Sequence, residues 1–257
     1  MPGELSRRVA IAAIAAIAAA PIAATAKTRE PAMLRVGDQL PRFDLVRPGA
    51  KTYLISTTKD GRHNATNIWR RETRFENGKL RIVQHWDGVG SNAPFVDRDS
   101  LFELGTFRPS SHTRVTVQPG KRTVEGYLFR DRGIVGLPDL PDNVRSDFSV
   151  TSDEPMFNFE TDMEMLGALP WAPGFAVSIP FFHPAPDSVP AHYLWACAGD
   201  EVLSGPDGRP LDCWIVVCDY NAGGPPTRFW YAKRTQQFVK LEGPGRDSAV
   251  HRKTLLW

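Results

Sequence analysis

One short segment constrains the fold more than any other. The pair Asn77-Gly78 divides the sequence WRRETRFENGKLRIVQHW, residues 69–86, into two halves of alternating residues. Asn-Gly is the strongest short-range signal for a β-hairpin, because both residues of a type I′ turn take positive φ. A turn centred there pairs Phe75 with Leu80, Thr73 with Ile82, Arg71 with Gln84, and Trp69 with Trp86. All four pairs fall on one, mostly apolar face, so turn chemistry and alternation predict the same register.

The rest of the chain also contains short strand patterns. Strands are predicted at residues 100–109, 112–117, 122–130, 175–182, 191–203, 211–220, 227–233 and 236–242. Pro, Gly and charged residues separate them, as turns between antiparallel strands require. Residues 250–257, by contrast, lack regular alternation. We therefore expect a mainly β fold, with a single domain over residues 51–257 that follows an extended segment over residues 27–50.

The first 26 residues are typical of a secretory signal peptide. Arg7 and Arg8 precede the apolar run VAIAAIAAIAAAPIAA, residues 9–24, and Ala24-Thr25-Ala26 has the small residues of a cleavage site. The run is short and weak for a membrane-spanning helix, which needs roughly 20 strongly apolar residues. We predict cleavage after Ala26, export to the periplasm, and no transmembrane span in the mature chain.

A change of period marks the segment that precedes the strand at 175–182. Apolar residues recur at helical spacing at Met156, Phe159, Met163 and Leu166. This stripe predicts an amphipathic helix over residues 155–168, which Asp153 could cap and which Pro170 would end. A single apolar stripe implies packing on one face of a sheet. The helix is therefore predicted to be a plug or a lid and not a membrane anchor.

The sequence carries no recognisable catalytic or cofactor-binding motif. Its six histidines lack metal-ligand spacing, and neither C-x-x-C nor G-x-S-x-G occurs. We therefore expect no metal, no cofactor and no enzymatic activity. Asp200-Glu201, as a general acid and base with a distant His, is the hydrolase alternative, while a salt bridge to a neighbouring strand is the structural interpretation. A formal net charge of +2 gives no electrostatic reason to expect nucleic acid as a partner.

The three cysteines, Cys197, Cys213 and Cys218, leave two interpretations open. If the turn of the 191–220 hairpin centres near Asp207-Gly208, Cys197 lies opposite Cys218 and a cross-strand disulfide is predicted. The alternative is three buried free thiols, which behave as small apolar residues.

Large aromatic residues occupy most of the predicted strands. They could be the core of a curved sheet under the helix, or they could line a cavity for an apolar ligand. On the second interpretation, the predicted lining is Trp69, Trp86, Phe159, Met163, Leu166, Trp195, Trp214 and Trp230.

Three segments carry a resemblance to a known group of proteins: LGALPWAPG (166–174), EVLSGPDGRPLDCW (201–214) and FWYAKRTQQFVKLE (229–242). Over residues 50–243 the chain resembles a family of exported bacterial proteins of unknown function that is related to the lipoprotein carriers LolA and LolB. The resemblance implies a strongly curved antiparallel sheet, a half-open β-barrel, with helical segments plugging its concave side. In the carriers, that concavity holds acyl chains.

These observations lead to one functional hypothesis and one alternative of another class. We expect a monomeric, non-enzymatic periplasmic protein whose half-barrel binds a hydrophobic or amphiphilic, lipid-like ligand of the cell envelope. The alternative is a structural or interaction protein of the envelope, with an envelope protein as its partner and no small-molecule ligand.

Overall fold

The computed structural model describes residues 30–185, 188–220 and 224–256. The predicted signal sequence and its cleavage site after Ala26 lie outside the described residues. Within these ranges, no helix is both long and apolar enough to cross a membrane.

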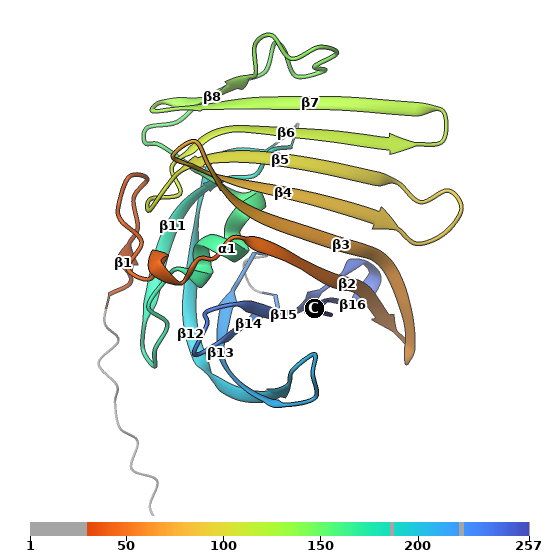
Figure 1. Cartoon of the computed structure of the whole chain (residues 1–257), viewed down its shortest axis with the longest axis vertical. Helices are drawn as coiled ribbons and strands as arrows, with labels where there is room; N and C mark the ends of the chain where they lie inside the picture. Colours follow the sequence, from red (N-terminus) through yellow and green to blue (C-terminus); the bar gives the residue numbers. More distant parts are fainter. Residues whose placement is uncertain (1–29, 186–187, 221–223, 257) are drawn as a thin grey trace, which may run out of the picture.

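The chain is mainly β and forms one continuous, strongly curved sheet (Figure 1). The strands of its first half are β1 (Ala32–Met33), β2 (Gly49–Lys59), β3 (Arg62–Glu76), β4 (Lys79–Gly88), β5 (Phe95–Glu103), β6 (Pro109–Gln118), β7 (Lys121–Arg130), β8 (Gly133–Gly136) and β9 (Ser149–Thr151). Those of its second half are β10 (Phe157–Asn158), β11 (Ala176–Phe182), β12 (Ala191–Ser204), β13 (Pro210–Cys218), β14 (Thr227–Ala232), β15 (Phe238–Pro244) and β16 (Val250–Leu255). The helical elements are α1 (Asp162–Gly167) and the 3-10 turns η1 (Phe43–Leu45), η2 (Phe159–Thr161) and η3 (Arg246–Ser248).

The strand order explains the half-open barrel. Neighbours follow the path β1-β11-β12-β13-β14-β15-β16-β2-β3-β4-β5-β6-β7-β8-β9, and β1 and β10 both pair in parallel with β11. All other neighbours are antiparallel. Figure 1 shows α1 enclosed by the curve, between the strands from β3 to β7 and those from β11 to β14. The end strands β1 and β9 are not paired with each other, so the described sheet is curved but not closed.

The hairpin of β3 and β4 confirms the predicted register. Trp69 pairs with Trp86 and Phe75 with Leu80, and the turn residues Asn77 and Gly78 both take positive φ, 50° and 72°. The turn residues and the alternation of the flanking residues are both local signals, so the sequence alone was enough to place the two strands.

The predicted helix over residues 155–168 is wrong in its first half. Phe157 and Asn158 form β10, which pairs with β11, so their backbone groups serve a sheet and not a helix. The Asn158 side chain accepts a hydrogen bond from the Glu160 backbone N–H at 3.1 Å and starts the η2 turn. The α-helix begins at Asp162 and has six residues, of which five are buried. A short helix buried nearly all round is a plug inside the sheet and has no single apolar stripe.

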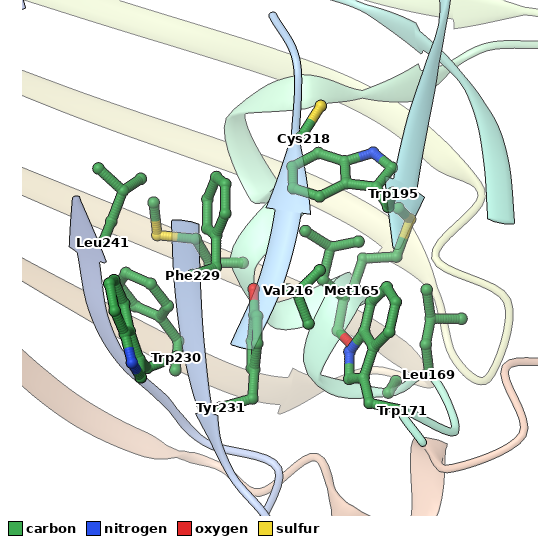
Figure 2. Packing of buried hydrophobic residues seen from close by; sticks show 14 of the residues in the cluster. Met165, Leu169, Trp171, Trp195, Val216, Cys218, Phe229, Trp230, Tyr231 and Leu241 are labelled. Atoms are coloured by element: carbon green, nitrogen blue, oxygen red, sulfur yellow. The ribbon is translucent and has the colours of Figure 1, made fainter. Parts of the chain in front are cut away.

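The main core lies between this plug and the sheet and includes residues of both halves, such as Trp69 of the first half and Trp195 of the second. Figure 2 shows Trp195, Val216 and Phe229, from three neighbouring strands, near Met165 and Trp171 of the helical segment. Trp171 donates a hydrogen bond from its indole N–H to the Leu166 carbonyl at 2.7 Å, which fixes the corner that follows α1.

The predicted pairing of Cys197 with Cys218 is wrong. The β12–β13 turn spans the residues between Ser204 and Pro210, and a bulge between Cys197 and Gly199 shifts the register again. Cys197 therefore faces Val216, and Cys218 faces Trp195. All three cysteines are free.

Several regions of regular structure were not predicted from the sequence. They are β1 and η1 in the segment expected to be extended, β2, the first parts of β3 and β5, and the strands β8, β9 and β16. β16 fits between β15 and β2, where Leu241 pairs with Lys253 and Tyr53 with Leu255. This strand joins the two halves of the sheet and brings His251 and Lys253 to the cavity described next.

Candidate functional site

A cavity of about 430 Å³ lies between the plug and the concave face of the sheet. Its lining comes from β3, β4 and β5 on one side, from η2 and α1, and on the other side from β12, β14, β15, β16 and the residues that follow β11 and β13. The lining combines aromatic rings with charged side chains. Because the site gathers residues from distant parts of the chain, the curvature of the sheet creates it.

Two indoles in contact, tilted by 38° to each other, form one wall of the cavity. The rings of Trp69 and Trp86 are 4.7 Å apart between centroids. Gln84 holds both, because its side-chain oxygen accepts hydrogen bonds from the two indole N–H groups at 3.2 and 3.3 Å. The Gln84 amide N–H₂ in turn donates to the Glu160 carbonyl at 2.7 Å, which ties this wall to η2.

Three cationic side chains surround these indoles. The guanidinium of Arg71 lies 4.5 Å from the centroid of the Trp69 ring, and that of Arg98 lies 4.7 Å from the centroid of the Trp86 ring. The Lys253 Nζ lies 4.5 Å from Trp69 and 5.6 Å from Trp86. Cations at these distances are attracted by the negative faces of the rings. The wall is therefore both aromatic and cationic.

The opposite wall is a cluster of rings around Phe159. Its centroid lies 4.9 Å from His183, 5.4 Å from Tyr193 and 5.6 Å from Tyr220. Burial lowers the pKa of His183, and Arg114 and Arg98 lower it further against the attraction of Glu160. Aromatic rings present apolar area at low conformational cost, which suits this wall to the apolar part of a ligand.

An ion-pair chain runs from the cavity into the first half of the sheet. Arg98 and Arg114 both bind the Glu160 carboxylate, at 3.3 and 2.7 Å. Arg114 also lies 3.4 Å from Glu125, which binds Arg145 at 2.9 Å. Burial alone would raise the pKa of Glu160, but the two guanidinium groups hold it well below its ordinary value. Glu160 is therefore a carboxylate over the whole physiological pH range.

A second buried pair closes the floor of the cavity. Arg71 is 4% exposed and binds the carboxylate of Glu164 through two nitrogens, with the Nε contact at 2.6 Å. Arg71 also donates to the Glu160 carbonyl at 3.2 Å. Arg71 and Met163 border both this cavity and a second one of about 210 Å³ on the far side of the pair. These side chains thus separate two hollow regions of the barrel.

Two further charges in the cavity have strongly perturbed pKa values. Burial raises the pKa of Asp162 to about 7, against the attraction of Lys253 and Arg71. Burial lowers the pKa of Lys253 to about 8, and Arg71 and Arg98 act in the same direction against Asp162. Burial likewise lowers the pKa of His251, to about 4. Perturbed titratable groups that gather in a cavity are a common mark of a functional site.

The structure brings together half of the predicted lining. Trp69, Trp86, Phe159 and Met163 border the cavity. Leu166 and Trp195 are fully buried in the core. The other two predicted lining residues do not border the cavity either, although Trp230 is buried in the same core cluster.

Trp214 and Trp230 are both away from the cavity. Trp214 is half-buried under the ammonium of Lys233, 4.3 Å from the ring centroid. Trp230 alternates with Phe229 and Tyr231 along β14, so it points to the other face of the sheet. There its ring is covered by Lys240, whose Nζ lies 4.4 Å from the centroid.

The acidic pair of the hydrolase alternative lies outside the cavity as well. Asp200 binds Lys233 at 2.5 Å. This is the kind of salt bridge that the structural interpretation of the acidic pair predicted. Glu201 accepts a hydrogen bond from the indole N–H of Trp230 at 2.8 Å. Neighbouring residues of a strand point to opposite faces, so the two carboxylates cannot act on one atom. Over residues 30–185, 188–220 and 224–256, no three His, Cys, Asp or Glu side chains are grouped as ligands for a metal ion.

The sequence did not predict the charged side chains of the site. Nothing in the local sequence distinguishes these residues from solvent-exposed charges: Glu160 and Asp162 lie in the predicted helix, and Arg98 and Lys253 lie outside the predicted elements. One signal was present, because the predicted hairpin placed Arg71 and Gln84 on its apolar face. A charge and an amide among apolar residues indicate buried polar groups that need partners across the fold.

Comparison with known proteins gives a family but no activity. The family "Protein of unknown function (DUF3108)" matches residues 52–244. No curated protein matches the chain. A similar solved structure is the crystal structure of a beta-barrel-like protein of the domain of unknown function DUF1849 from Brucella abortus. It is 13% identical, covers 82% of this chain and 97% of that one, and has a TM-score of 0.45. The relation to the lipoprotein carriers stays a prediction. Because the family model matches most of the length of this chain, the chain belongs to the DUF3108 family.

Proposed function

We propose that the protein binds an amphiphilic ligand of the cell envelope in the cavity between the plug and the sheet. The observation that carries this proposal is the composition of the cavity walls. One wall is formed by the rings around Phe159, and the other by the Trp69–Trp86 pair with its cations. A ligand with an apolar part and a polar end matches both walls.

The size and shape of the cavity support this proposal. A volume of about 430 Å³ falls in the range of small-molecule sites, roughly 300–1,000 Å³. The site is built on strands and on a buried helix and is therefore largely preformed. Ligand uptake would not need to unfold a core element.

The proposed compartment is the periplasm. This part of the proposal rests on the arginine, apolar and small-residue order of residues 1–26. Cell fractionation of the full chain, with sequencing of the mature N-terminus, tests it. A mature chain that begins at Lys27 in the periplasmic fraction is expected, and an uncleaved chain in the membrane fraction would contradict it.

Native mass spectrometry of protein isolated from bacterial envelope extract tests the binding proposal. A lipid-sized mass adduct that organic extraction removes is expected. The isolated protein should also take up the apolar fluorescent probe N-phenylnaphthylamine, and Trp86→Ala should weaken the uptake. Trp214→Ala is the matched control, because this half-buried indole also lies beneath a cation but outside the cavity.

The outcomes separate the two functional classes. Weaker uptake in the Trp86→Ala variant alone, with circular dichroism unchanged, supports a ligand site at the cavity. A clean mass without adduct, together with no probe uptake, would overturn the proposal and favour an envelope interaction protein without a ligand.

A further inference from the structure

The charges around the cavity do not cancel. The ion-pair chain described above contains three guanidinium groups, those of Arg98, Arg114 and Arg145, and two carboxylates, those of Glu160 and Glu125. This ion-pair chain therefore carries one net positive charge. At the cavity end of this chain, Arg98 shares the Glu160 carboxylate with Arg114, so the guanidinium that borders the cavity has no carboxylate of its own.

Arg98 also has an unused hydrogen-bond donor. Its Nε is buried and has no partner in the part of the chain that the structure describes. A buried donor without an acceptor costs free energy, roughly 1–3 kcal/mol in proteins. An acceptor supplied by a ligand would remove that cost.

Lys253 is a second cation at the cavity, and it has no ion-pair partner among the described residues. Its Nζ takes part in none of the ion pairs formed between described residues and rests on the Trp69 and Trp86 rings. The acidic group with the strongest influence on it is Asp162. Burial raises the pKa of Asp162 to about 7, so this carboxyl is only partly ionised at neutral pH and offsets Lys253 incompletely.

We infer that the polar end of the ligand is an oxyanion, a phosphate or a carboxylate, bound between Lys253 and Arg98 over the Trp69–Trp86 wall. This inference rests on the proposed function and names its ligand class. Charge-assisted hydrogen bonds to a guanidinium and an ammonium are the strong interactions by which proteins hold such groups. The apolar chain of the ligand would then lie against the rings around Phe159.

A series of amphiphiles with one alkyl chain and different head groups tests this inference. The probes are dodecyl phosphate, dodecanoate, dodecanol and dodecyltrimethylammonium, each titrated below its micelle concentration and followed by tryptophan fluorescence. We expect at least one of the two anionic probes to bind about tenfold more tightly than dodecanol, and the cationic probe to bind most weakly. The ratio of the two anionic affinities distinguishes a phosphate from a carboxylate head group.

Two lysine variants assign the preference to the site. Lys253→Gln should remove most of the anion preference while dodecanol still binds. Lys233→Gln is the matched control, because Lys233 also lies over an indole, Trp214, but outside the cavity. If Lys253→Gln fails to fold by circular dichroism, Arg98→Gln takes its place.

The results distinguish failure of the inference from failure of the proposed function. Equal binding of anionic, neutral and cationic probes, or an anion preference that survives the folded cavity variant, would overturn the inference and leave amphiphile binding intact. Binding of none of the four probes would overturn the proposed function itself. Displacement of dodecyl phosphate by an equal concentration of inorganic phosphate would indicate a soluble anion and would overturn the amphiphilic ligand class.

Discussion

The Arg71–Glu164 pair gives the sharpest test of how this interior is held together. Replacing Arg71 by Met removes the cation and leaves the Glu164 carboxylate, 16% exposed, facing an apolar side chain. The substitution also removes the donor to the Glu160 carbonyl and the cation over Trp69. The apolar volume stays similar, so the expected effect is electrostatic.

The magnitude follows from burial. Removing one member of a buried ion pair typically costs about 3–5 kcal/mol, because the remaining charge is left desolvated. For a chain of this size, each kcal/mol lowers the melting temperature by about 2–4 °C, so a fall of about 6–20 °C is expected. Replacing both partners, Arg71→Met with Glu164→Leu, removes both charges. The double variant should lose less free energy of unfolding than the two single variants lose together, by about 2 kcal/mol or more.

Urea unfolding, followed by tryptophan fluorescence and far-ultraviolet circular dichroism, measures these free energies. The matched control is Arg74→Met on the same strand, where the partner is Glu72 and the two side chains are 41% and 42% exposed. Exposed pairs contribute little, so this control should lose less than about 1 kcal/mol. The reasoning is refuted if Arg71→Met costs no more than Arg74→Met, or if the double variant is exactly additive.

Three further results are expected. A Cβ added at Gly136 would lie 2.0 Å from the Arg145 carbonyl oxygen, so Gly136→Ala should cost about 2 kcal/mol or more in urea unfolding, and a loss below about 0.5 kcal/mol would contradict the close packing there. Burial raises the pKa of Asp162 to about 7. At pH values between the ordinary pKa of an aspartate and about 7, the native state therefore binds more protons than the unfolded chain. The stability from this group is thus present at low pH and lost as the pH rises through about 7. The midpoint of urea unfolding should fall over this pH range, and Asp162→Asn should make the fall smaller. An unchanged dependence of the midpoint on pH would argue against a buried neutral carboxyl. Finally, burial raises the pKa of Cys213 to about 11 and Cys197 is half-buried, so a thiol reagent should modify at most one cysteine in the native protein and all three after unfolding. A single reactive thiol after unfolding would instead indicate a disulfide.

The parts of the fold that the sequence predicted are those set by local chemistry. The β3–β4 hairpin was placed residue by residue because its turn requires positive φ at Asn77 and Gly78, and its alternation agrees with that turn. The helix was misplaced because β11 offers Phe157 and Asn158 backbone partners that a helical pattern cannot reveal. Tertiary pairing outweighed local propensity there.

The site was harder to predict than the fold, for a geometric reason. Arg98, Glu160 and Lys253 come from separate elements and meet only after the sheet has curved around the plug. Each has the appearance of a solvated charge in its own segment. Of the aromatic residues predicted to line a ligand site, Trp69 and Trp86 border the cavity. Trp230 does not, because its strand parity directs it to the other face of the sheet.

The position of β16 has a consequence for how the chain acquires its shape. This strand follows β2 to β15 in the sequence but pairs with both β15 and β2, for example Val250 with Thr58. During synthesis, the two half-sheets emerge first and each keeps an open edge that can pair with another chain. Because the pairing of β16 with β2 closes a very long loop, we expect the junction to form late, as a slow, non-local step of folding. The same strand carries Lys253, so the binding cavity gains this cation only when the junction forms.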